Sequence, residues 1–211
     1  MGALLSNLAV VAESEGDLET ARAMNERALA VREQVGDRWA ISVSLNNLGM
    51  VAHLQNDFAA AERRFEASMQ LAAEVGDRWI VAVGHHNLGN ARLGLGHLVE
   101  AGAEFLEALE AYEDFGDRWS LALLIEDVVP LAIALDKPFE ALQLVGAADA
   151  MRRDLDAPRP PATVTLLEST IAGAQSSIDV TEGDARLLGE QLTGVELSEL
   201  LRGLSTPIIQ E

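Results

Sequence analysis

Four histidines are the side chains of this sequence best suited to acid–base or metal chemistry: His53, His85, His86 and His97. Adjacent residues of a helix point in different directions, so His85 and His86 do not form a paired metal grip by themselves. No His-Glu-x-x-His motif accompanies them, and the chain has no cysteine that could serve as a thiolate ligand or nucleophile. We therefore expect no metal, no cofactor and no catalytic residue, and the sequence does not indicate an enzyme.

Glycine-rich stretches give no evidence of a nucleotide site. No Gly-x-x-x-x-Gly-Lys loop occurs, and no strand pattern precedes Gly94-Leu95-Gly96. We interpret this last stretch as a turn between helices.

The charge and hydropathy of the chain exclude some classes of partner. With 15 basic and 34 acidic residues, the net charge is −19, which repels phosphate backbones and argues against direct nucleic-acid binding. The most apolar segment, 121–135, contains two acids and a proline and is shorter than the roughly 20 residues of a membrane span. No secretory signal precedes it, so the sequence predicts a cytoplasmic protein without a membrane partner.

One tetrad, Gly-Asp-Arg-Trp, organises the chain. It occurs three times at an interval of 40 residues, and such a fixed period indicates a solenoid of repeated units. Glycine can end one helix in the left-handed conformation, and aspartate can cap the next. We expect the three tryptophans to pack between repeats rather than to form a ligand cage. The tetrad residues are Gly36, Asp37, Arg38, Trp39, Gly76, Asp77, Arg78, Trp79, Gly116, Asp117, Arg118 and Trp119.

The unit after the first tetrad is a predicted helix hairpin. From Trp39 to Leu54 the apolar residues follow helical spacing, Asn56-Asp57 supplies a turn and a cap, and a second helical stripe runs from Phe58 to Val75. The spacing of small and large residues in this unit, with Asn47-Leu48-Gly49, Ala61 and Phe65, resembles the tetratricopeptide pattern.

The other units share this resemblance to different degrees. The third matches at Asn87-Leu88-Gly89, Ala101 and Phe105, the first has Asn25 where an aromatic residue is expected, and the fourth is degenerate. The resemblance implies an all-α, right-handed superhelical solenoid of helix hairpins. We predict hairpins at 1–35, 36–75, 76–115 and 116–155, followed by a proline-rich connector and a helical cap at 156–211 that packs on the fourth hairpin.

Both ends of the repeat region carry further predictions. The first hairpin has no preceding tetrad, which indicates that the chain was cut from something longer. The first helix of the fourth hairpin is apolar on nearly every side and must be covered on both faces, while Pro130 should kink or break it. Helices are expected from about 162 to 178, 184 to 192 and 195 to 204, with a loop at 179–183 and a frayed tail at 205–211.

The C-terminal third adds a second resemblance. Residues 144–148, 157–161 and 195–200 look like the end of the tetratricopeptide region in large actinobacterial regulators, which combine a signalling ATPase domain with such repeats. This resemblance implies an interaction or sensor module for signal transduction or transcription regulation.

Family resemblance also identifies candidate binding positions. In tetratricopeptide arrays the concave groove is lined by fixed positions of the first helix of each hairpin. The family's carboxylate clamp uses lysine and arginine at these positions, and this chain has none there. We therefore expect a helix or extended segment with apolar anchors and some positive charge. The groove positions are Ser6, Val10, Glu13, Asn46, Met50, His53, His86, Asn90, Leu93 and Glu126, with Ile133 beyond them.

Three functions are compatible with this pattern. The leading one is a non-enzymatic module that binds a protein or peptide segment, or another domain of its parent protein. A small-molecule sensor that uses the groove is the first alternative, and an enclosed apolar pocket under the cap would favour it. A self-associating scaffold is the second alternative. For all three functions, the sequence leaves open whether the groove is open or filled by the C-terminal helices.

Overall fold

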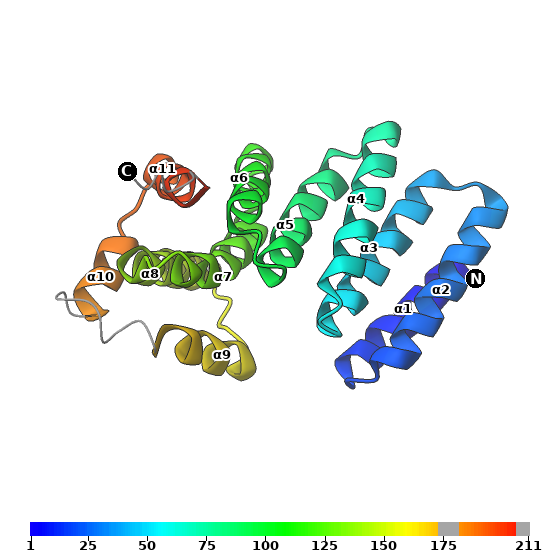
Figure 1. Ribbon diagram of the computed structural model, residues 1–211, viewed down its shortest axis with the longest axis horizontal. Coiled ribbons are helices and arrows are strands. Elements are labelled where there is room, and N and C mark those ends of the chain that lie inside the picture. The colour runs from blue at the N-terminus through cyan, green and yellow to red at the C-terminus, as the bar shows by residue number, and fades with distance from the viewer. Residues whose placement is uncertain (173–181, 206–211) are drawn as a thin grey trace. The chain divides into compact units, whose positions relative to one another are not determined.

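The computed structural model describes residues 1–172 and 182–205, and within those ranges every regular element is an α-helix (Figure 1). The helices form two compact units, Met1–His97 and Leu98–Glu211. This confirms the all-α fold of helix hairpins. In chain order the helices are α1 (Gly2–Ser14), α2 (Leu18–Val35), α3 (Arg38–Leu54), α4 (Phe58–Val75), α5 (Arg78–Gly94), α6 (Leu98–Phe115), α7 (Arg118–Ala134), α8 (Pro138–Asp154), α9 (Pro161–Ala172), α10 (Glu182–Gly189) and α11 (Gly194–Ser205).

The Gly-Asp pair of each tetrad ends one helix and begins the next, as predicted. Gly36, Gly76 and Gly116 adopt positive φ angles of 74°, 78° and 64°, a conformation that only glycine adopts without strain. The aspartate that follows each glycine accepts a hydrogen bond from the backbone N–H three residues later, at 3.0, 3.0 and 3.1 Å. The tetrad is therefore a helix stop and a helix start in consecutive residues.

The Arg and Trp of the tetrad lie at the edge of the hairpin. Arg38 forms an ion pair with Glu74 at the end of α4, and Arg118 does the same with Asp154 of α8 at 2.7 Å. Trp39, Trp79 and Trp119 are 51%, 50% and 49% exposed. Each ring is therefore half covered rather than buried, because a first-turn position at the hairpin edge leaves one side of it in water, and packing of the tryptophans between repeats stays a prediction.

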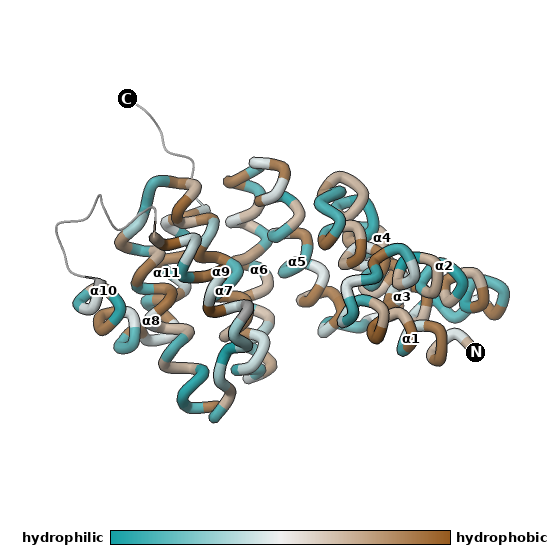
Figure 2. The backbone as a smooth tube through the Cα atoms, turned by 90° about the horizontal axis from the view of Figure 1, so that it is seen from below, coloured by the Kyte–Doolittle hydropathy of each residue, from teal (hydrophilic) through white to brown (hydrophobic). Residues whose placement is uncertain are grey.

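The core of the first unit is built from small residues facing large ones. In residues 1–97, α3 packs against α2 and α4, and α4 packs against α3 and α5. A Cβ atom on Gly49 would lie 2.4 Å from the Phe65 ring, so this position requires glycine. Phe65 is fully buried with Ala61 and Leu88. Figure 2 shows the matching pattern of apolar and polar residues that alternate along the helices.

The second unit is organised around α7, which is apolar on nearly all sides. This helix packs against α6, α8 and α9, so both faces are covered, as its composition predicted. It runs as one helix through Pro130 to Ala134, so of the two predicted outcomes, a kink or a break, the break does not occur. An internal proline costs about 3 kcal/mol, but burial of neighbours such as Val128, Val129 and Leu131 outweighs that cost.

The C-terminal helices pack on two different hairpins, the one formed by α7 and α8 and the one that contains α6. α9 contacts α7 and α8, α10 packs on α8, and α11 packs on α6 rather than on the fourth hairpin. The packing of α10 on α8 is close, since a Cβ on Gly146 would lie 2.0 Å from the carbonyl oxygen of Arg186. The predicted loop at 179–183 and the tail after 205 lie largely outside the described residues. The division into four hairpins and a cap stays a prediction.

Candidate functional site

Nine of the ten predicted groove residues lie on α1, α3 and α5 in the first unit, and α3 contacts both of the other helices. We call this set the α1–α3–α5 face. Its members sit at equivalent places in consecutive hairpins because the repeat length is constant. They are Ser6, Val10, Glu13, Asn46, Met50, His53, His86, Asn90 and Leu93.

These nine residues differ in how far they are open to a partner. Val10 is 58% exposed, whereas Ser6 and His86 are buried. Met50 packs partly on the core around Phe65, and His53 stacks edge-on against Phe58 with ring centroids 5.3 Å apart. The open part of the face is therefore narrower than the sequence predicted, since half of each hairpin's first helix is used for packing.

Two asparagines tie α3 to α5 beneath this face. The side-chain amide of Asn87 donates to Oδ1 of Asn46 at 2.9 Å. Because Asn46 and Asn87 come from neighbouring hairpins, this bond fixes the spacing of the two helices that carry the candidate residues. The sequence identified Asn46 but not its partner.

Glu13 is the acidic member of the face. Its Oε1 lies 3.5 Å from Nδ2 of Asn25, which is fully buried on α2. Partial burial raises the pKa of Glu13 from its ordinary value, and the hydrogen bond from Asn25 opposes part of that rise. Glu13 is the one acid among the nine residues of the face, so a positive group on a partner would be drawn to this end of it.

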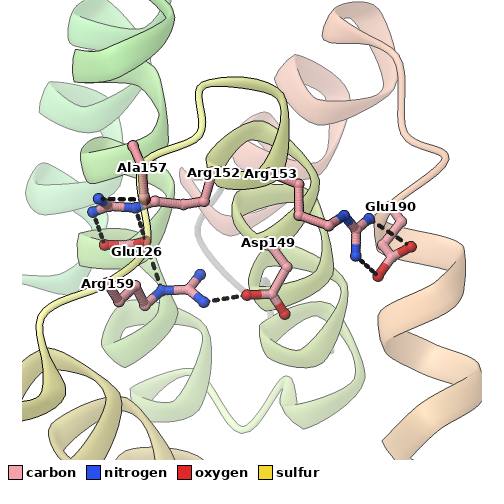
Figure 3. A network of polar contacts seen from close by, with 7 residues as sticks. All are labelled: Glu126, Asp149, Arg152, Arg153, Ala157, Arg159 and Glu190. Carbon is pink, nitrogen blue, oxygen red and sulfur yellow. Dashed lines mark hydrogen bonds and ion pairs between the residues drawn. The ribbon is translucent and has the colours of Figure 1, made fainter.

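The tenth predicted residue, Glu126, lies in the second unit and is buried rather than open. Its carboxylate accepts two hydrogen bonds from Arg152, at 2.9 and 2.8 Å, and one from Arg159 at 2.7 Å (Figure 3). Arg159 also pairs with Asp149. A carboxylate bound by two guanidinium groups is not an open acidic position, and the assignment of Glu126 to a partner-binding groove stays a prediction.

Sequence reasoning missed the two arginines of this ion cluster. Arg152 ends α8, and Arg159 stands between prolines in the connector, where the sequence suggested only stiffness. The available signal was Glu126 itself, because an acid in a helix that is apolar all round needs a buried cation. Arg152 also lies over the Trp119 ring, 5.1 Å from its centroid.

Within residues 1–172 and 182–205, no three His or acidic side chains gather in a way that would hold a metal ion. No helix in those same ranges is long and apolar enough to cross a bilayer.

Comparisons with known proteins agree with the fold. The family model described as tetratricopeptide repeat matches residues 1–74 and 41–114, which together are more than half of the chain. Two crystal structures of putative kinesin light chain TPR-like repeats from Podosopora anserina, the first of them a point variant, are 15% identical with TM-scores of 0.60 and 0.59. Each alignment covers 96% of this chain and 93% of that one. A search of curated proteins found no match.

Proposed function

Because this chain belongs to the tetratricopeptide repeat family, whose repeats generally mediate contacts between proteins, we propose that it is a non-catalytic module that binds a protein segment on the α1–α3–α5 face. The observation that carries this proposal is the row of nine side chains at repeat-equivalent positions on α1, α3 and α5, seven of which are partly or well exposed. Such a row suits one helix or extended segment laid across three hairpins.

Charge and side-chain type define the segment that fits. The face combines apolar groups, such as Val10 and Leu93, with neutral amides and the carboxylate of Glu13. It presents no lysine or arginine, so an acidic peptide would find no counter-ion there. We assign it a segment with apolar anchors and positive charge, which the acidic chain also attracts over longer distances.

A matched pair of variants tests this assignment. The probe is a fluorescein-labelled helical peptide with leucines on one side and lysines on the other, followed by anisotropy. Val10→Arg places a positive charge on the face, whereas Val35→Arg makes the same change on α2, where the side chain is 76% exposed. We expect Val10→Arg to weaken binding about tenfold and Val35→Arg to leave it unchanged.

Salt and peptide charge complete the test. Binding should weaken as ionic strength rises, because screening removes the long-range attraction. A peptide with glutamates in place of the lysines should bind more weakly than the basic one. Equal effects of the two valine variants, or a preference for the acidic peptide, would refute the proposed face.

The wider context we propose is a bacterial signalling or transcriptional regulator, in which this cytoplasmic module relays binding to an effector domain. The support is the resemblance of residues 144–148, 157–161 and 195–200 to actinobacterial regulators. The genomic reading frame that contains this sequence tests the context directly. A signalling ATPase domain in that frame would support it, and a frame with no such domain would contradict it.

Self-association is a second candidate function, and α1 carries the observation that favours it. Leu4, Leu8 and Val11 are about half exposed, whereas their counterparts forty residues on, Ser44, Leu48 and Val51, are buried. The apolar row on α1 is therefore exposed at positions that are buried in the second hairpin. Sedimentation equilibrium should show a dimer that Leu8→Glu dissociates, and a monomer at high concentration would exclude this candidate.

A further inference from the structure

A cavity of about 400 Å³ lies in the second unit between α7, α9 and the connector that joins α8 to α9. Its walls are mainly apolar and come from both sides: Trp119, Leu123 and Pro130 from α7, and Pro160, Leu166 and Leu167 from the connector and α9. Its volume falls in the range of small-molecule pockets. The proposed function makes no use of this cavity.

The cavity leaves apolar surface in contact with water. Leu166 is 68% exposed and Trp119 is about half exposed, although both line it. A ligand that covered these two side chains would remove that surface from water, which is favourable. The walls therefore select for an apolar molecular body.

The polar end of the cavity is formed by arginines. Arg152 lines the cavity with its partner Glu126, and both side chains are 6% exposed. A second cavity of about 610 Å³ shares Arg152 and Pro158 with the first and is also lined by Arg159. The two guanidinium groups thus lie where the apolar space meets the polar one.

Arg159 has a hydrogen-bonding group that the described residues leave unsatisfied. Its Nε donates to Glu126 and its Nη1 pairs with Asp149, but its Nη2 is buried and has no partner. A buried N–H without an acceptor has lost water and gained nothing in return. Glu126 neutralises one of the two guanidinium charges, and the other is balanced by Asp149, which is partly exposed at the edge.

From these contacts we infer that the second unit binds a small apolar carboxylic acid, with its body between Trp119 and α9 and its carboxylate at Nη2 of Arg159. The donors of Arg152 are already used by Glu126 and Ala157, whereas Nη2 of Arg159 can form a charge-assisted hydrogen bond to a carboxylate. Glu126 and Asp127 also line the apolar cavity, so the acid group is placed beyond them, where Arg159 lines the second cavity.

The test uses the intrinsic fluorescence of Trp119. In a chain with Trp39→Phe and Trp79→Phe, all tryptophan emission comes from the cavity wall. The probe is decanoate, kept below the concentration at which it aggregates, and the neutral control is 1-decanol. We expect a saturable blue shift with both probes and about tenfold tighter binding of decanoate.

Three variants separate the contributions of the two ends. Arg159→Gln should remove the preference for decanoate and leave 1-decanol binding as it was, which also shows that the cavity is intact. Leu167→Asn should weaken both probes. Arg202→Gln, which removes an exposed arginine paired with Glu110 in the same unit, should change neither.

Several outcomes would overturn the assignment. A linear, non-saturable response to decanoate would mean that no site exists. A preference for decanoate that survives Arg159→Gln would place the acid elsewhere. Loss of 1-decanol binding in Arg159→Gln would show that Arg159 shapes the cavity and does not bind the carboxylate.

Discussion

Trp39 and Trp119 occupy the same place in the repeat and are equally exposed, yet they have different neighbours. The indole N–H of Trp39 donates to Asp77, the cap of the next hairpin, at 2.7 Å. The ring of Trp119 lies beneath the guanidinium of Arg152 and forms a cavity wall. The tetrad tryptophan thus bonds one repeat to the next in the first unit, whereas in the second unit it lines a candidate ligand site.

The difference between the two regions arises on the facing helix. Position 72 of α4 is a fully buried alanine, and the equivalent position 152 of α8 is a buried arginine. That arginine needs a counter-ion, which Glu126 supplies at the position of Asn46 in the second hairpin. The repeat therefore places residues 72 and 152 at equivalent positions. The change from alanine to arginine at this position is what creates the ion cluster of the second unit.

Overall charge separates the two regions as well. Residues 1–97 contain eight arginines and twelve acidic residues, a net charge of −4, whereas residues 98–211 contain seven basic and 22 acidic residues, a net charge of −15. The buried arginines of the second unit are therefore exceptions in an acidic half of the chain. The first unit, by contrast, has a candidate face whose side chains are neutral apart from the carboxylate of Glu13.

The largest effect should come from breaking the ion cluster. Glu126→Ala leaves Arg152 buried with no carboxylate partner, and we expect a loss of about 3–5 kcal/mol in the free energy of unfolding. Urea denaturation followed by circular dichroism measures it. Glu190→Ala breaks the exposed pair with Arg153 and should cost about 1 kcal/mol or less. Similar losses for the two variants would contradict the role given to Glu126.

A smaller effect of opposite sign is expected in the first hairpin. Asn25 stands where the second hairpin has Phe65, and its Oδ1 is buried without a hydrogen-bond partner. Asn25→Leu should stabilise the chain by about 1 kcal/mol, because it removes an unsatisfied acceptor from an apolar site. Thermal unfolding measures the shift. A lower melting temperature would mean that the hydrogen bond from Nδ2 of Asn25 to Glu13 contributes more than the unsatisfied Oδ1 costs.

Trp39→Phe should be mildly destabilising, because it removes the hydrogen bond from the indole N–H to Asp77. The phenyl ring keeps most of the apolar contact but cannot donate to Asp77, so we expect a cost of about 0.5–1 kcal/mol. The same urea experiment detects it. A loss as large as that of a buried aromatic residue would show that the indole contributes far more to repeat packing than its half exposure indicates.

The smallest predicted effect depends on pH. Because burial raises the pKa of Glu13 in the folded chain, folding takes up a proton there, and stability falls as pH rises through the range between the unfolded and folded values. Glu13→Gln should therefore raise the melting temperature slightly at neutral pH and not at about pH 4. A gain that is equal at both pH values would rule out this titration.

The points at which helices end and begin were the part of the structure that the sequence predicted well. The Gly-Asp junctions stop and start helices through local forces, so Gly36 and Asp37 could be assigned without tertiary information. Side-chain partners were harder, because Arg152 and Arg159 meet Glu126 only after α8 and the connector fold back on α7. The half exposure of the tryptophans could not be predicted for the same reason, since a first-turn position does not show what covers it.

Photo-crosslinking tests the central claim, that a protein partner uses the α1–α3–α5 face, most directly. The basic leucine–lysine peptide would carry benzophenone at one leucine position, and mass spectrometry would locate the attachment. We predict attachment at Val10, Met50 or Leu93. Attachment confined to residues 98–211 would contradict the claim.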